Sequence, residues 1–537
     1  MDERDPVPIS VSIKANLYKD SVALMRIGQI VLAREGVQRA TLLMGTPANK
    51  AILASAGLSS DALDAARPGD VMISVDAATT ELVDAAIAEI AAQLDGERNV
   101  QATGAATTIP LRSIAMGRAR AATAALAQIS VPGPYAAAEA MKALRQGLHV
   151  FLFSDNVPLE QEHAIKTLAR QKGLLVMGPD CGTAIIHGTP LGFANVVRDG
   201  AIGLIGASGT GLQEVTCQIH ALGHGIRHAI GTGGRDVYAE IGGSTMRQAI
   251  DLLAADPATR VIGIVSKPPA PAVAKQILDQ LAAVDKPVVV LFLGADLTAY
   301  KLAPHVVAVT TLFDAAAATV ALLEGKHFVR STPRDEWSRA AQAEVERLAP
   351  GQRRLRGLYS GGTFCTEAQL IWGGLGLRVH SNAPVDKHTA SDDPARGSGH
   401  LALDLGDDEF TVGRPHPMID PSARVERIAQ EAADPATAVI VLDVVLGYAG
   451  HDDPAGVLAP AIVQARAACA KAGRHLVVVT FVCGTEEDPQ RLSVQQARLR
   501  EAGALVLPSS TAAARLAGEI GQRIAAHSEQ PSLEQVK

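Results

Sequence analysis

Short runs of consecutive apolar residues alternate with longer, alanine-rich stretches along most of the chain. Continuous apolar runs indicate strands buried on both faces, and the stretches between them are long enough to form helices. The strands expected from this pattern are Ala40–Met44, Leu148–Phe153, Leu174–Met177, Ile202–Ile205, Val261–Val265, Val288–Leu293, Leu355–Tyr359, Ala438–Val444 and Leu476–Val482. Buried strands that alternate with helices predict an α/β fold built on doubly wound parallel sheets.

Two polar stretches interrupt this alternation. Residues 96–111 are polar and irregular, which predicts a surface loop. Residues 331–350 are charged and have a helical pattern, and they stand between two apolar blocks, so we expect a linker there. The chain ends in a polar segment, 526–537, that we expect to be a disordered tail.

The chain contains an internal repeat. The segment LAADPATRVIGIV around Asp256 matches EAADPATAVIVLDVV around Asp434, and each copy lies between a strand with a glycine turn and a further strand. The second copy carries an insertion at roughly residues 380–425. The same order of elements in both copies predicts two related flavodoxin-like domains, at 198–330 and 351–525.

Each copy has a Ser/Gly/Thr turn where a strand gives way to a helix. Glycine lets an anion approach the backbone, and the unpaired amides and dipole of a helix N-terminus attract negative charge. An ordinary helix cap explains one such turn, but two at equivalent positions favour a phosphate site. No Walker A motif is present. The phosphate-binding candidates are Ser208, Gly209, Thr210, Gly211, Ser360, Gly361, Gly362 and Thr363.

Composition narrows the class of protein. Of 537 residues, 47% are hydrophobic and only 3% aromatic, which suits aliphatic cores. The net charge of −7 and the lack of a basic stripe disfavour nucleic-acid binding. No apolar run reaches the ~20 residues of a membrane helix, and the charged N-terminus does not resemble a signal peptide. Five scattered cysteines without a CxxC pair argue against a metal site and fit a cytoplasmic setting.

Several motifs carry a family resemblance. GPDCGT from Gly178 and the turn at Ser208 resemble the α subunit of succinyl-CoA synthetase, and the segment from Gly357 resembles the ligase domain of its β subunit. MGTPANK, FSDNV, VMGPDCGT, GASGTG and TVGRPHPMID are similar to the FdrA family of acyl-CoA synthetase-like proteins. The resemblance implies a Rossmann-like, CoA-binding-type domain at 1–197, ahead of two ligase-type domains.

The chain departs from the synthetase pattern in ways that bear on cofactors. It has no ATP-grasp-sized segment, and the usual glycine-rich CoA loop is missing, so CoA is possible but not required. The loop FLGADLTAYKLAPH lacks the phosphohistidine motif, and His305 comes only at its end, before a predicted strand. Lys267 occupies the place of a synthetase glutamate, where an ammonium would bind an anion directly.

Further candidates lie in loops. Lys267, Arg414 and His416 are expected to be catalytic, the last two in a loop stiffened by prolines. Cys181 and Cys365 are weak candidates for nucleophiles, because no partner base is identifiable. The residues expected to bind substrate are Arg235, Asp236, Asn156 and Asp180.

Three functions follow from these features. The family resemblance implies a subunit of oxamate carbamoyltransferase, which interconverts oxalurate plus phosphate with oxamate plus carbamoyl phosphate in purine and allantoin breakdown. The alternatives are an acyl-CoA ligase subunit that uses a partner's nucleotide domain, and a non-catalytic scaffold that binds a metabolite. The missing domains favour a hetero-oligomer with additional enzyme subunits.

Overall fold

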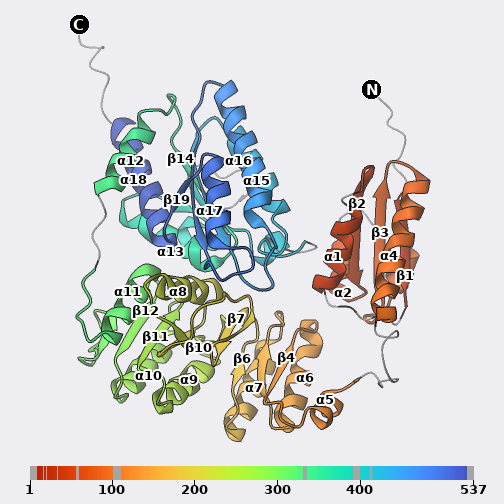
Figure 1. Cartoon of the computed structure of the whole chain (residues 1–537), viewed down its shortest axis with the longest axis horizontal. Helices are drawn as coiled ribbons and strands as arrows, with labels where there is room; N and C mark the ends of the chain where they lie inside the picture. The colour runs from red at the N-terminus through yellow and green to blue at the C-terminus, as the bar shows by residue number, and fades with distance from the viewer. Residues whose placement is uncertain are drawn as a thin grey trace. The chain divides into compact units, whose positions relative to one another are not determined.

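The structure, a computed structural model, describes residues 9–15, 17, 19, 21–32, 34–55, 60–100, 111–330, 335–390, 399–411 and 414–528. Its contacts divide the chain into two units. The first comprises Met1–Arg112 with Thr411–Pro415, and the second comprises Ser113–Phe410 with His416–Lys537. Figure 1 shows the elements of both units in chain order, coloured from red at the N-terminus to blue at the C-terminus.

The first unit contains a three-stranded antiparallel sheet in the order β1-β3-β2. Its elements are β1 (Ile9–Lys14), α1 (Ser21–Leu32), β2 (Val37–Met44), α2 (Pro47–Ser55), α3 (Asp61–Ala65), β3 (Val71–Ala77) and α4 (Thr80–Val100). Every residue of the central strand β3 is buried, and Val71, Ile73, Val75 and Ala77 form one core with residues of α1 and α4. Helix α4 continues to residue 100, which corrects the loop predicted from residue 96, and residues 101–110 lie outside the described part of the chain.

A small parallel sheet, β4-β5-β6, opens the second unit. Its elements are α5 (Ile114–Arg120), β4 (Leu126–Ile129), α6 (Gly133–Arg145), β5 (His149–Leu152), α7 (Leu159–Lys172) and β6 (Val176–Met177). The hairpin β7 (Thr183–Ile186) and β8 (Thr189–Gly192) pairs instead with the next sheet, through β10. The single domain expected over 1–197 is therefore divided among three sheets, because its first strands pair antiparallel and its last strands pair onward.

The first repeat forms a seven-stranded sheet in the order β13-β12-β11-β9-β10-β7-β8. Its elements are β9 (Ile202–Gly206), α8 (Gly209–Ala221), β10 (Ile226–Gly231), α9 (Ser244–Ala255), β11 (Val261–Ser266), α10 (Pro271–Ala282), β12 (Val288–Phe292), β13 (Val306–Ala308) and α11 (Leu312–Leu323). The five strands from β9 to β13 are parallel and follow the order expected for a flavodoxin-like sheet.

The second repeat forms a six-stranded parallel sheet in the order β15-β16-β14-β17-β18-β19. Its elements are β14 (Arg354–Tyr359), α13 (Gly362–Gly374), β15 (Val379–His380), η1 (Lys387–Thr389), β16 (His400–Asp404), α14 (Asp408–Thr411), α15 (Ser422–Ala433), β17 (Thr437–Val445), α16 (Pro454–Lys471), β18 (Val477–Cys483), α17 (Leu492–Glu501), β19 (Leu505–Leu507) and α18 (Ser510–Ser528). Strand β16 neighbours β14 as β10 neighbours β9. The predicted insertion at 380–425 thus contains a strand of the repeated fold.

These sheets confirm an α/β fold with several parallel-sheet domains, and each of the nine predicted strands is present. The predicted linker 331–350 contains a helix, α12 (Asp335–Val345), whose Ala341 is fully buried in the core. The Ser338 hydroxyl of α12 donates to the Glu519 carboxylate of α18 at 2.7 Å. The described part of the linker is therefore packed against the second repeat. The predicted tail begins inside α18, and residues 529–537 lie outside the described chain.

The repeated DPAT sequence forms the same helix-to-strand turn in both copies. The Asp256 carboxylate accepts the Ala258 amide at 3.2 Å, and the Asp434 carboxylate accepts the Ala436 amide at 2.9 Å. Such a side chain to backbone bond stabilises a turn without help from neighbouring strands. The repeat seen in the sequence is therefore explained by local backbone chemistry at the amino edge of each sheet.

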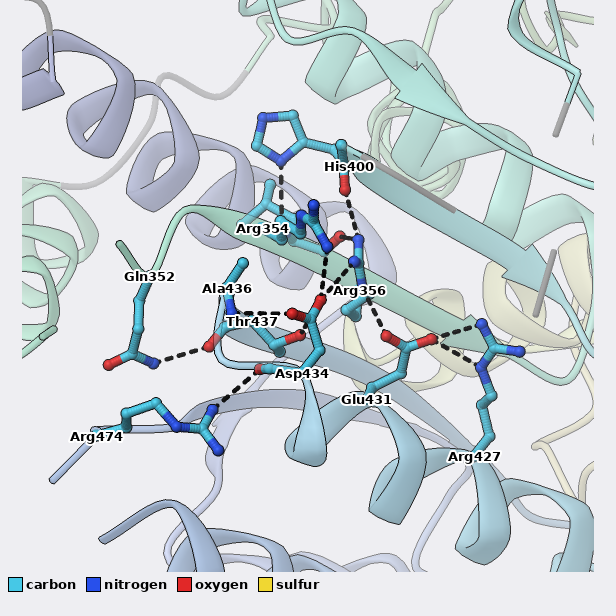
Figure 2. A network of polar contacts seen from close by, with 12 residues as sticks. Gln352, Arg354, Arg356, His400, Arg427, Glu431, Asp434, Ala436, Thr437 and Arg474 are labelled. Carbon is cyan, nitrogen blue, oxygen red and sulfur yellow. Dashed lines mark hydrogen bonds and ion pairs between the residues drawn. The ribbon is translucent and has the colours of Figure 1, made fainter. Parts of the chain in front are cut away.

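In the second repeat this turn anchors a larger polar network, drawn in Figure 2. The Arg356 guanidinium pairs with Glu431 at 2.6 Å and with Asp434 at 3.0 Å, and Arg354 pairs with Asp434 at 2.9 Å. Glu431 also accepts a hydrogen bond from Arg427 at 2.8 Å. Arg356 and Glu431 are both buried, so each charge depends on these partners rather than on water.

Candidate functional site

The N-termini of α8 and α13 meet at the carboxyl edges of the two repeated sheets. The Ser208 side chain caps α8 by accepting the Gly211 amide at 3.0 Å. Its hydroxyl also forms a short hydrogen bond with the Thr363 hydroxyl in the first turn of α13. A Cβ on Gly361, the N-cap of α13, would lie 2.5 Å from Thr210 Cγ2 in the first turn of α8. The two turns therefore face each other in a reciprocal arrangement.

This arrangement gathers two sources of positive potential at one place. The amides of a helix's first turn have no acceptors within the helix, and the dipoles of α8 and α13 both end here. An anion between the helices would accept hydrogen bonds from both first turns and replace the hydroxyl pair of Ser208 and Thr363. Six of the eight predicted phosphate-binding residues lie at this junction, and their binding of phosphate stays a prediction: Ser208, Gly209, Thr210, Gly361, Gly362 and Thr363.

The other two predicted phosphate ligands have different tasks. Ser360 is buried, its amide donates to Asp443 at 2.9 Å, and its hydroxyl makes a short hydrogen bond to the same carboxylate. Arg424 supports that carboxylate at 3.0 Å. The Gly211 amide is bonded to Ser208. Ser360 and Gly211 are thus corrected to residues that build the turns, since their donors already have acceptors.

The glycine at the N-cap of α13 provides a direct test of this junction. Gly361→Ala should weaken sulfate binding by about tenfold, because the added Cβ meets Thr210 and pushes the helices apart. Isothermal titration with sulfate measures the change, and Gly361→Ala with Thr210→Gly should restore affinity. Gly373→Ala in the same helix is the control, since a Cβ there meets no atom within 4 Å. Equal affinities for Gly361→Ala and Gly373→Ala would contradict the reciprocal packing.

Lys267 follows β11 directly and lies at the same edge of the first sheet. Its side chain is exposed, and a Cβ on Gly234 would lie 3.7 Å from its Nζ and 3.9 Å from an Asp180 oxygen. The charge of Lys267 acts on both Asp180 and Asp404, and it lowers the pKa of each. The charge of Lys267 therefore reaches one carboxyl group in the loop after β6 and one at the end of β16.

The carboxyl groups around Lys267 are unusually basic. Asp180 remains accessible although protein encloses most of it, and burial together with the Asp155 charge raises its pKa to about 6. Burial raises the pKa of Asp404 to about 7, with Asp407 adding to the effect. Asp404 touches the phosphate turn, since its Oδ2 lies 2.7 Å from where a Cβ on Gly362 would be. Near neutral pH this edge can therefore change its charge.

These raised pKa values predict how anion affinity depends on pH. Asp180 and Asp404 are neutral at about pH 5 and charged at about pH 8, so the positive potential of Lys267 is progressively offset as the pH rises. Sulfate affinity should fall roughly tenfold over this range. Sulfate is the suitable probe because its charge is constant there. Asp180→Asn with Asp404→Asn should flatten the profile, and an unchanged slope would contradict this assignment.

His416 lies beside the α13 junction, whereas Arg414 belongs to the first unit. His416 Nε2 is 2.6 Å from where a Cβ on Gly406 would be, and the Ser360 carbonyl is 2.8 Å from the same point. The ring contacts Phe193 at a centroid distance of 5.9 Å, and burial lowers its pKa to about 4. A neutral imidazole can act as a base or nucleophile. The catalytic roles of Arg414 and His416 stay predictions.

The predicted substrate residues also separate. Asp236 is fully buried and accepts bonds from Lys166, Thr245 and Met246 at 2.8–3.0 Å, so it is corrected to a structural residue. Arg235 pairs with Glu162 at 3.0 Å but stays partly exposed, and its charge lowers the pKa of Asp180.

Asn156 is exposed in the loop after β5, with a left-handed backbone at φ 51°. It directly follows Asp155, whose charge reaches Asp180. Asn156 and Asp180 therefore remain candidates, on loops that follow neighbouring strands of the small sheet.

Three weaker candidates, Cys181, Cys365 and His305, lie in surroundings that do not favour catalysis. Burial raises the pKa of both Cys181 and Cys365 to about 12, which disfavours reactive thiolates. His305 Nε2 is 3.1 Å from the Leu281 carbonyl oxygen, so this ring is bound to α10.

Within the described ranges, no three His, Cys, Asp or Glu side chains could together hold a metal ion. No described helix is both long and apolar enough to cross a membrane.

The sequence predictions missed Asp404, Asp443 and Asp155. Asp404 ends strand β16 and Asp155 follows β5, so both could have been found by searching the carboxyl ends of parallel strands for polar residues. Asp443 lies inside β17, where its only signal is a charged residue in an apolar run.

Family comparisons agree with this division of the chain. A family model described as "CoA-ligase" matches residues 358–520, and one described as "CoA binding domain" matches residues 197–294. The CoA-binding match thus falls on the first repeat rather than on residues 1–197. A model described as "AllF, heavy metal-associated domain" matches residues 7–110. That segment has no Cys or His, so its residues do not fit a heavy-metal site.

Similar proteins fall into two groups. The Escherichia coli (strain K12) protein YahF, described as uncharacterized, is 41% identical over 514 residues, covering 95% of this chain and 98% of its own length. A mitochondrial succinate–CoA ligase [ADP-forming] subunit alpha-2 from Trichomonas vaginalis is 32% identical over 179 residues, which is 31% of this chain and 55% of that protein. This chain therefore spans only about half of that ligase subunit.

A solved structure of a dinucleotide-forming acetyl-coenzyme A synthetase from Ca. Korarchaeum cryptofilum covers 76% of this chain and 85% of its own, at 15% identity and a TM-score of 0.31. This likeness is too low to support an argument about function.

Proposed function

Because the chain belongs to the same family as the Escherichia coli protein YahF and carries CoA-binding and CoA-ligase domains, we propose that it is a subunit of an acyl-CoA ligase-type enzyme. The observation that carries the proposal is the meeting of two helix N-termini at the hydroxyls of Ser208 and Thr363. Two first turns that face one anion suit the phosphate of an acyl phosphate. A partner subunit would supply the nucleotide-binding domain.

In this proposal each part of the edge has a role. The amides of Gly209, Thr210, Gly362 and Thr363 bind the phosphate, and Lys267 neutralises charge that develops on its oxygens or on a substrate carboxylate. Positioning and charge stabilisation account for most of the rate, since phosphate leaves without a strong base. The phosphate turn of α8 also fits the phosphates of CoA, and CoA is the acceptor to test first.

His416 is the candidate residue for carrying phosphate covalently. Its neutral ring lies next to the α13 turn, within the group that contains Ser360 and Asp404. A ligase that works through a phosphohistidine would use this residue. Incubation with radiolabelled phosphate donor and partner subunit should then give an acid-labile label that His416→Ala removes.

A second candidate, the carbamoyl transfer expected from the FdrA resemblance, is favoured by a separate observation. The loop after β12 contains no histidine before His305, whose ring is bound to Leu281, and Lys267 stands where an acid would orient such a histidine. A site of this kind can move a carbamoyl group between phosphate and oxamate without a phosphoenzyme. A stable phosphoenzyme would rule this candidate out.

One experiment compares the two candidates. The chain should be purified with its co-purifying partners and assayed for acyl-CoA formation from ATP, CoA and short dicarboxylates, and for carbamoyl phosphate formation from oxalurate and phosphate. Acyl-CoA formation supports the ligase, and carbamoyl phosphate supports the transferase. If the complex does neither and the chain binds neither CoA nor phosphate in titrations, both proposals fail and a metabolite-binding scaffold becomes the better description.

A further inference from the structure

Two buried glutamates occupy the same position in the two helices that form the anion junction. Glu214 lies in α8 and Glu367 lies in α13, each six residues after the helix N-cap at Ser208 or Gly361. Their exposed fractions are 0% and 1%. Carboxylates are seldom fully buried without a specific partner, so the repetition of this one in both copies calls for a shared role.

Each glutamate reaches the last helix of the other repeat. Glu214, in the first repeat, accepts the Ser510 amide at 3.0 Å, at the start of α18 in the second repeat. Glu367, in the second repeat, accepts the Leu312 amide at 2.8 Å, at the start of α11 in the first repeat. Each carboxylate thus caps the N-terminus of a helix that belongs to the other repeat.

Ser510 and Thr511 join the two caps. The hydroxyls of Ser510 and Thr511 donate to Glu367 at 2.6 and 2.8 Å, while the Ser510 amide is held by Glu214. One residue therefore bonds to both glutamates. Figure 1 shows α11 and α18 at this junction beside α8 and α13, so four helices are tied together here.

The caps lie behind the anion junction. Six residues of α-helix span about 9 Å, so these contacts are about 9 Å deeper along α8 and α13 than the pair Ser208–Thr363. Contacts at two depths fix both the separation of two helices and their tilt. A single contact at the N-termini would leave the tilt free.

We propose that Glu214 and Glu367 are positioning residues that hold the two helix N-termini at the separation at which one anion contacts both. The inference rests on the proposed function only in taking phosphate as that anion. Neither glutamate touches the anion, so each acts through the helix that carries it. The alternative is that the two carboxylates stabilise the fold without affecting the junction.

The test compares these glutamates with a matched buried one. The variants are Glu214→Ala and Glu367→Ala, and the control is Glu431→Ala, which removes a buried glutamate at the opposite edge of the second sheet. Titration with inorganic phosphate should show about tenfold weaker binding for the first two variants. The control should bind phosphate within about twofold of the unchanged protein, even if its thermal midpoint falls as much as those of the two test variants. Equal losses in all three variants would overturn the proposal.

Conservative variants keep the test decisive if alanine prevents folding. Glutamine at 214 or 367 retains one acceptor oxygen and the side-chain volume, so it should recover most of the phosphate affinity. Recovery of stability without recovery of affinity would leave the positioning role unsupported and count against the proposal.

A second readout does not depend on phosphate. Hydrogen exchange should rise across the repeats: Glu214→Ala at the first amides of α18, and Glu367→Ala at the first amides of α11, with faster exchange at the first turns of α8 and α13 in both. If the unchanged protein binds no phosphate, the proposed function fails, yet this cross-repeat pattern still decides the inference. Exchange that rises only within the mutated repeat would overturn it.

Discussion

Lys267→Ala is expected to lower kcat/KM of the assembled enzyme by about 10²–10³-fold while the fold stays intact. The side chain is exposed at the end of β11, so its removal leaves no cavity. The loss arises because the charge of Lys267 acts on both Asp180 and Asp404, so that Lys267 offsets their charge and attracts the anion. Steady-state kinetics with the reaction that the complex supports, and phosphate titration of the chain, measure the effect.

Lys275→Ala is the matched control for this change. Lys275 is an exposed lysine on the next helix, α10, and its ion-pair partner at 2.6 Å is Asp279 of the same helix. It should leave kcat/KM within about twofold, because a surface ion pair contributes little. Near-normal rates for Lys267→Ala, with circular dichroism unchanged, would show that Lys267 is only a solvated residue at a strand end.

Arg356→Met is expected to cause the largest loss of stability, about 3–5 kcal/mol in the free energy of unfolding of the second repeat. Arg356 is 2% exposed and pairs with both Glu431 and Asp434 (Figure 2). Methionine fills a similar volume but leaves buried carboxylate charge with fewer partners. Urea unfolding followed by tryptophan fluorescence measures it, since both tryptophans, Trp337 and Trp372, lie in the core that contains the second repeat.

Arg354→Met tests whether burial is the cause. Arg354 pairs with the same Asp434 oxygen as Arg356, but a quarter of its side chain is exposed. Its loss should therefore cost no more than about 1 kcal/mol. Similar values for the two variants would mean that the network stabilises by the number of its ion pairs rather than by burial.

Much of the second unit could be predicted from the sequence because its signals are local. Apolar runs located the strands, and the DPAT turns, closed by their own aspartates, revealed the duplication. The glycine turns were placed correctly because a helix N-terminus is itself a local feature.

The rest depends on contacts between segments distant in sequence. No residue near Ser360 in the sequence indicates that its hydroxyl donates a hydrogen bond to Asp443, 83 residues later. Lys166 binds Asp236, 70 residues away, so Asp236 is a structural residue and not the predicted substrate ligand. The antiparallel pairing of β1 with β3 was equally hidden, because buried strands look alike in sequence whichever way they run.

The meeting of α8 and α13 within one chain also has a kinetic consequence. Joined by a linker that contains α12, the two repeats encounter each other at an effective concentration that for short linkers is on the order of millimolar. Assembly of the junction is then a unimolecular event, which dilution does not reverse. A cell that makes this chain therefore always makes the two halves of the junction in equal numbers.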